Sequence, residues 1–71
     1  MTERASYTFT VKEHGDGTPF LMLEPRSENL RLLDRGFLSF DLLEGTSYEQ
    51  AQEIAGYMSR HLRSLAYTSL A

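Results

Sequence analysis

The feature that most constrains this chain is an amphipathic pattern over residues 46–66. Thr46 and Glu49 have the spacing of a capping box, which satisfies two backbone amides at a helix start. The apolar residues that follow recur at helical spacing and fall within an arc of about 120°. A helix of this kind has to rest on an apolar surface provided by earlier residues. The arc contains Tyr48, Ala51, Ile54, Ala55, Met58, Leu62, Leu65 and Ala66.

Strand-like runs before position 45 can form that surface. Residues 6–12 and 37–43 alternate apolar with polar side chains, which is typical of half-buried strands. Residues 20–23 are apolar on both faces, which favours a central strand or one that lies beside a partner. The glycine-rich residues 14–18 predict a hairpin turn before that run.

The pattern predicts an α+β fold: a small antiparallel sheet of three to four strands, hairpin first, with one C-terminal amphipathic helix packed on one face. The platform for the helix is expected to consist of Tyr7, Phe9, Val11, Leu38, Phe40 and Leu42. Burial of these side chains at about 1.5–3 kcal/mol each is the main stabilising contribution.

Residues 27–35 are open to two interpretations. Ser27 can begin a short helix that turns Leu30 and Leu33 inward and stops at Gly36. Alternatively, residues 30–33 form a strand that residues 34–36 turn into the next one. We favour the strand, because a helix of eight residues has little to stabilise it.

The length of 71 residues indicates one domain, residues 1–71, with frayed ends at 1–5 and 67–71. A chain this short hides only about 60% of its unfolded surface, so its core is thin. Cysteine is absent, which excludes disulfides and thiolate metal sites and leaves good packing or self-association. No signal-peptide pattern and no apolar run near the roughly 20 residues of a membrane span is visible, so we expect a cytoplasmic protein.

No catalytic constellation is visible, and we expect a non-enzymatic protein without cofactor or metal. Glu24 and Asp41 are carboxylates with nothing to fix their separation. His14 is interpreted as a solvated histidine of the turn.

The net charge of −3 repels phosphate, so nucleic-acid binding is disfavoured. Six of the seven basic residues are arginine, a residue suited to bidentate anion binding. Arg26, Arg31 and Arg35 are the candidate anion contacts, with a self-neutralising loop as the alternative. A weak nucleic-acid binder is therefore the lowest-ranked binding function.

A protein–protein interface is the leading expectation, and a homodimer its leading form. Phe20 and Met22 occupy a strand with more apolar surface than one helix covers. The exposed face of this strand, or an open sheet edge, is expected to meet the second copy. Gly56 lies in mid-helix, where glycine costs about 1 kcal/mol relative to alanine, and close approach of a partner would explain it. Tyr57 and His61 lie together at the edge of the apolar arc and complete the candidate interface.

The order of a hairpin, a further strand and then a helix entered through Gly-Thr-Ser-Tyr-Glu-Gln-Ala resembles the N-terminal domain of HicB-type antitoxins. The resemblance covers the layout of residues 6–63. It implies a regulatory partner that binds a larger protein. The family's Pro-Asp-Leu-Pro-Gly segment and a DNA-binding C-terminal extension are missing, so no residue roles are carried over.

Overall fold

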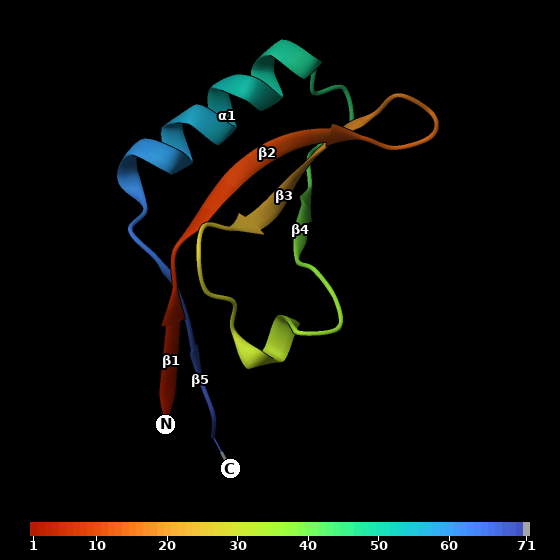
Figure 1. Cartoon of the computed structure of the whole chain (residues 1–71). Coiled ribbons are helices and arrows are strands. Elements are labelled where there is room, and N and C mark those ends of the chain that lie inside the picture. The colour runs from red at the N-terminus through yellow and green to blue at the C-terminus, as the bar shows by residue number, and fades with distance from the viewer. Residues whose placement is uncertain (71) are drawn as a thin grey trace.

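The computed structural model describes residues 1–70 and has an α+β fold, with antiparallel strands and one helix (Figure 1). A three-stranded sheet has the order β2-β3-β4, and β1 and β5 form a separate antiparallel pair. The helix packs on β2 and β3, as the sequence predicted. The elements are β1 (Thr2–Ala5), β2 (Tyr7–Glu13), β3 (Pro19–Pro25), the 3-10 helix η1 (Arg31–Leu33), β4 (Ser39–Asp41), α1 (Tyr48–His61) and β5 (Leu65–Thr68).

The hairpin β2–β3 forms as predicted, with Phe9 opposite Leu23 and Val11 opposite Leu21. The run of residues 20–23 lies in the central strand, because β4 pairs with the other edge of β3. Directly opposed residues share a face, so one face of the sheet carries all the side chains expected to support the helix. Leu21 and Leu23 of β3 lie on the same face. Of the six predicted residues, Phe9, Val11 and Leu42 pack around the helix contact, Tyr7 and Leu38 pack in a second cluster with Leu23, and Phe40 is 39% exposed.

The helix seats on this face through small side chains. Ala51 and Ala55 are buried against Leu21, which is only 1% exposed. Ile54 and Tyr48 were predicted to share this contact, but both are exposed at the border of the stripe. Close seating on two alanines explains this, because it leaves larger neighbours on the helix flanks outside the contact.

The helix is shorter than predicted at both ends. Its N-cap is Ser47, whose Oγ accepts from the amide of Gln50 at 3.1 Å, while Gln50 Oε1 accepts from the amide of Ser47 at 2.9 Å. The capping box therefore starts one residue after Thr46. The hydroxyl of Thr46 instead donates to the carbonyl of Leu43 at 2.7 Å, in the turn that Gly45 forms with a φ of 89°.

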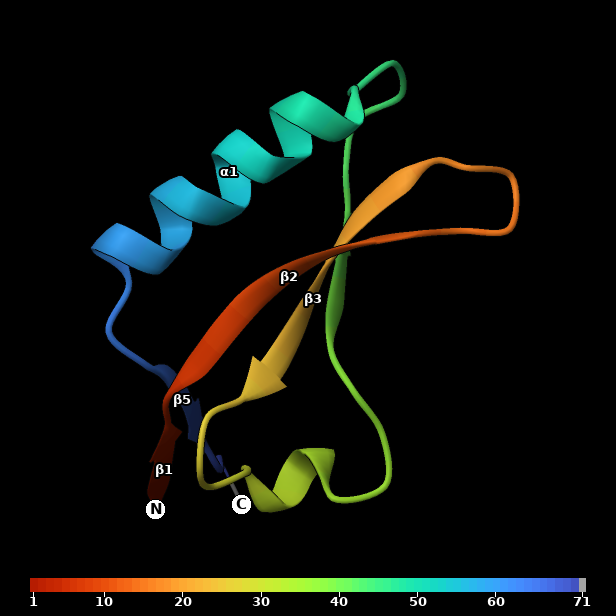
Figure 2. The ribbon, with the colours of Figure 1, turned by 45° about the horizontal axis from the view of Figure 1, so that its top comes forward.

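The chain ends were predicted to fray at residues 1–5 and 67–71, but residues 2–5 and 65–68 form the strands β1 and β5. They pair antiparallel from Thr2 opposite Thr68 to Ala5 opposite Leu65, and lie side by side in Figures 1 and 2. Ala5 is buried in a cluster against which Leu65 packs, so strand pairing also buries apolar surface. For the same reason Leu65 belongs to β5 rather than to the predicted helix. Residue 71 lies outside the described residues.

The preference for a strand at residues 30–33 is wrong. This segment contains η1, and Leu30 and Leu33 are buried, as the helical alternative predicted. The two leucines join a cluster with Tyr7 and Leu23, near the end of the sheet where β2 begins and β3 ends. The coil of this segment lies below the arrowhead of β3 in Figure 2. No helix in residues 1–70 is both long and apolar enough to cross a membrane.

Candidate interaction surfaces

The outer edge of β2 has no strand partner among the described residues. β3 pairs with one side of β2, and the carbonyl of Ser6 accepts from the amide of Arg26 on that side at 3.1 Å. Backbone groups of successive strand residues point to opposite sides. The amides and carbonyls of Tyr7, Phe9 and Val11 therefore point away from β3. A strand edge of this kind is a template for pairing with another chain.

A groove of about 390 Å³ runs along this edge, between β2 and one flank of α1. Its strand wall is formed by Phe9, Thr10 and Val11. No charged residue lines it, although the helix carries acidic and basic residues on neighbouring positions. The helix wall consists of Tyr48, Gln52, Ala55, Gly56 and Ser59.

Gly56 lies in the wall of this groove. A Cβ added at Gly56 would meet, within 4 Å, only the guanidinium of Arg60, at 3.2 Å. That group is the flexible end of a long side chain, so no packing contact within residues 1–70 requires glycine here. Close approach of a partner stays a prediction for this residue.

Phe20 and Met22 lie on the sheet face opposite to α1, where each is half-buried. The ring of Phe20 stacks on His14, with 4.4 Å between the ring centroids. The Nε2 of His14 lies 3.4 Å from Oδ1 of Asp41. The histidine of the turn therefore covers part of the apolar surface that the sequence assigned to an interface.

The two carboxylates considered for catalysis have separate basic neighbours on this face. Asp41 contacts His14, whereas Glu24 lies 3.4 Å from Nζ of Lys12. Within residues 1–70 no three His, Asp or Glu side chains gather as metal ligands would.

In the neighbouring turn, the amide and hydroxyl of Thr18 donate to Asp16 and lower the pKa of that carboxyl below its usual value of 3.8.

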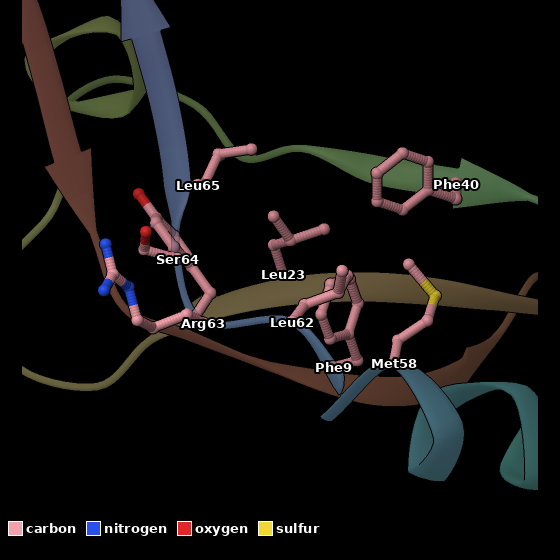
Figure 3. Close-up of a pocket in the computed structure, with 9 residues that line it drawn as sticks. Phe9, Leu23, Phe40, Met58, Leu62, Arg63, Ser64 and Leu65 are labelled. Carbon is pink, nitrogen blue, oxygen red and sulfur yellow. The ribbon is translucent and has the colours of Figure 1, made fainter. Parts of the chain in front are cut away.

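A small apolar cavity of about 90 Å³ lies between the sheet, the end of α1 and the start of β5 (Figure 3). The guanidinium of Arg63 points away from Phe40 and Met58 in this view. Sequence reasoning missed the cavity, because it extended the helix through the residues that border it. Its lining consists of Tyr7, Phe9, Leu23, Phe40, Met58, Leu62, Arg63, Ser64 and Leu65.

The three candidate anion contacts lie on the connection between β3 and β4, and all three side chains are exposed. Nε of Arg31 lies 3.5 Å from Oε1 of Glu3 on β1. Arg26 takes part in strand pairing through its backbone amide, and Glu28 and Asp34 are close in sequence to Arg35. This arrangement matches the mixed-charge alternative better than an anion site.

The five candidate interface residues are divided among three surfaces. Phe20 and Met22 lie on the open sheet face, and Gly56 lies in the groove. Tyr57 and His61 are exposed on α1, with ring centroids 4.3 Å apart, and line neither the groove nor the cavity.

The sequence predicted an open sheet edge in general, but it did not identify β2 as the strand that has this edge. The alternation of residues 7–13 identifies a strand but carries no signal for which strand lies outermost.

No protein-family model, curated protein or solved structure matches this chain. The similarity in layout to HicB-type antitoxins therefore has no matching family to support it.

Proposed function

We propose that this chain is a small, non-enzymatic, cytoplasmic interaction module that self-associates through the edge of its sheet. The single observation that carries the proposal is the unpaired side of β2, the longest strand edge left open among the described residues. Natural proteins shield such edges with charge, proline or covering elements. Residues 7–11 of β2 contain no charge and no proline.

Self-association would also stabilise the domain. Only eight apolar side chains in residues 1–70 are buried, and three of these are alanines. Small domains with a thin core gain stability from oligomerisation. Pairing of two edges would also cover the half-buried side chains of Phe9 and Val11.

Light scattering at micromolar concentration tests the proposal. A dimer has twice the monomer mass of 8.1 kDa, and a particle of 8.1 kDa at every concentration would reject it. Val11→Pro removes one outward amide without removing a bond to β3, since proline is tolerated at strand edges. We expect this variant to be folded and monomeric. Val11→Ala, which shortens the same side chain and keeps the amide, is the matched control and stays dimeric.

A second candidate function is the regulatory binding of a larger protein, and the apolar cavity favours it. The cavity has room for a small aliphatic side chain, and Phe40 and Leu62 beside it are exposed. A partner retained from the source cell by the wild-type chain but not by Leu62→Glu would support this function. Equal retention by both chains would contradict it.

A further inference from the structure

We propose that the occupant of the groove is a second copy of this chain, docked so that β2 pairs antiparallel with itself and the two α1 helices lie antiparallel beside each other. This inference rests on the proposed self-association and specifies its geometry. The juxtaposition that carries it is an unpaired strand edge next to an uncharged helix flank that contains Gly56.

The strand edge selects one register. Only residues with outward amides, which are the odd-numbered ones of β2, can exchange hydrogen bonds with the copy. Pairing of Tyr7 with Glu13 of the second copy, and of Phe9 with its Val11, aligns all seven residues of both strands. Thr10 then faces Thr10 across the two-fold axis. No like charges are opposed, since Lys12 faces Thr8.

The helix flank fits the same two-fold axis. At 100° per residue, Gln52, Gly56 and Ser59 lie within an arc of about 60° and all line the groove. A two-fold axis near Gly56 places Gln52 against Ser59 of the second copy. Helix axes are normally about 8–10 Å apart, and small residues at the crossing permit shorter distances. The absence of a side chain at Gly56 would therefore allow the two helices to approach closely.

Charges beside this flank complement each other in an antiparallel pair. Glu49 and Glu53 occupy the first half of α1, and Arg60 occupies its last turn. On the helical wheel all three lie next to Gly56, on the side away from the sheet. Antiparallel helices bring Glu53 of one copy to Arg60 of the other. Parallel helices would instead place like charges together.

Because the chain contains no cysteine, single-cysteine variants test the register directly. Non-hydrogen-bonded antiparallel pairs have Cα atoms about 4.5 Å apart. This distance lies within the range of about 4.4–6.8 Å that a disulfide spans. Thr10→Cys is therefore expected to cross-link quantitatively under mild oxidation.

Thr8→Cys is the matched control, since it changes the same residue type on the same face of the same strand. Its two copies would lie about 13 Å apart at about 3.3 Å per residue. We expect no cross-link. Equal cross-linking of Thr10→Cys and Thr8→Cys would overturn this geometry while self-association itself stands. Cross-linking of Met22→Cys, on the central strand β3, in place of Thr10→Cys would overturn it in the same way.

The helix contact is tested by charge reversal. Glu53→Arg and Arg60→Glu should each weaken the dimer by about tenfold, equivalent to about 1.4 kcal/mol, and the double variant should restore it. Gly56→Leu should give a folded monomer, because leucine favours helix and nothing but the end of Arg60 is near. A Gly56→Leu dimer as tight as wild type would contradict the helix contact. A wild-type chain that is monomeric at every concentration would reject the proposed function as a whole. If such a monomer bound an extended peptide along β2, the partner of this edge would be a strand of another protein instead of a second copy.

Discussion

The turn of residues 14–18 and the connection of residues 26–38 both join neighbouring strands, but they are held in different ways. The turn is closed by its own residues: the amide of His14 donates to the carbonyl of Thr18 at 2.9 Å, and Asp16 accepts from Thr18. The connection is held from a distance of more than twenty residues along the chain. The hydroxyl of Tyr7 donates to Oδ1 of Asn29 and accepts from the amide of Leu30 at 3.2 Å.

This difference shows which parts of a small domain a short stretch of sequence can specify. A local turn depends on residue types that are adjacent in the chain. The longer connection depends on a tyrosine in another element and on the cluster that buries Leu30 and Leu33. Substitutions in the connection should therefore destabilise the whole domain, whereas substitutions in the turn should affect mainly the hairpin.

The largest effect is expected from Leu30→Ala. This side chain is 2% exposed in the cluster with Tyr7, and its truncation should lower the free energy of unfolding by about 2–5 kcal/mol. Urea unfolding followed by circular dichroism measures the change. Leu32→Ala, two residues away and 56% exposed, should change it by less than about 0.5 kcal/mol. Similar losses in the two variants would mean that the connection is not part of the core.

Tyr7→Phe should have the next largest effect. The variant keeps the buried ring but leaves the buried amide of Leu30 without its acceptor and removes the hydrogen bond to Oδ1 of Asn29. An unsatisfied buried polar group costs about 1–3 kcal/mol. Hydrogen exchange of the Leu30 amide and urea unfolding both report the loss. Tyr67→Phe, at an exposed position of β5, is the control and should leave both unchanged.

Gly17→Ala tests the local turn. Gly17 has a φ of 87°, where a side chain is strained although the surrounding space is open. A loss of about 1 kcal/mol is expected from this strain. Gly15→Ala changes the same turn at a residue without a positive φ and should be neutral. A neutral result for Gly17→Ala would show that the turn tolerates other conformations.

The smallest effect concerns the acid dependence of the same turn. The hydrogen bonds from Thr18 lower the pKa of Asp16 below 3.8 in the folded state. The ionised carboxylate therefore stabilises the fold above the unfolded pKa, and this contribution is lost as the pH falls through the folded pKa. NMR titration should find the Asp16 pKa closer to 3.8 in Thr18→Val. An unchanged Asp16 pKa in that variant would exclude the Thr18 hydroxyl as a cause.

Sequence periodicity predicted the hairpin and the helix on the sheet, because each depends on residues that alternate or recur locally, and it gave a central position of residues 20–23 as one of two alternatives. The start of the helix was predicted one residue too early because two pairs of residues have the spacing of a capping box. Its end was predicted too late because apolar residues at helical spacing continue beyond the last helical residue. Ser47 and Gln50 form the capping box that Thr46 and Glu49 could also have formed.

The surroundings of the candidate interface residues were predicted only in part. The sequence identified Gly56 as unusual and Phe20 and Met22 as surplus apolar surface. It did not show that His14 stacks on Phe20, or that Gly56 borders the free edge of β2. These contacts join elements far apart in the chain, so local patterns carry no record of them.

The sequence by itself determined the strand and helix periods, the turn at Gly17 and the uncharged stretch of β2, because these depend on side-chain type and spacing. Only the tertiary structure decided that β5 pairs with β1, that Leu30 is buried under Tyr7 and that β2 lies at an edge. The physical reason is that a strand edge or a buried loop is defined by which distant segment comes to lie beside it.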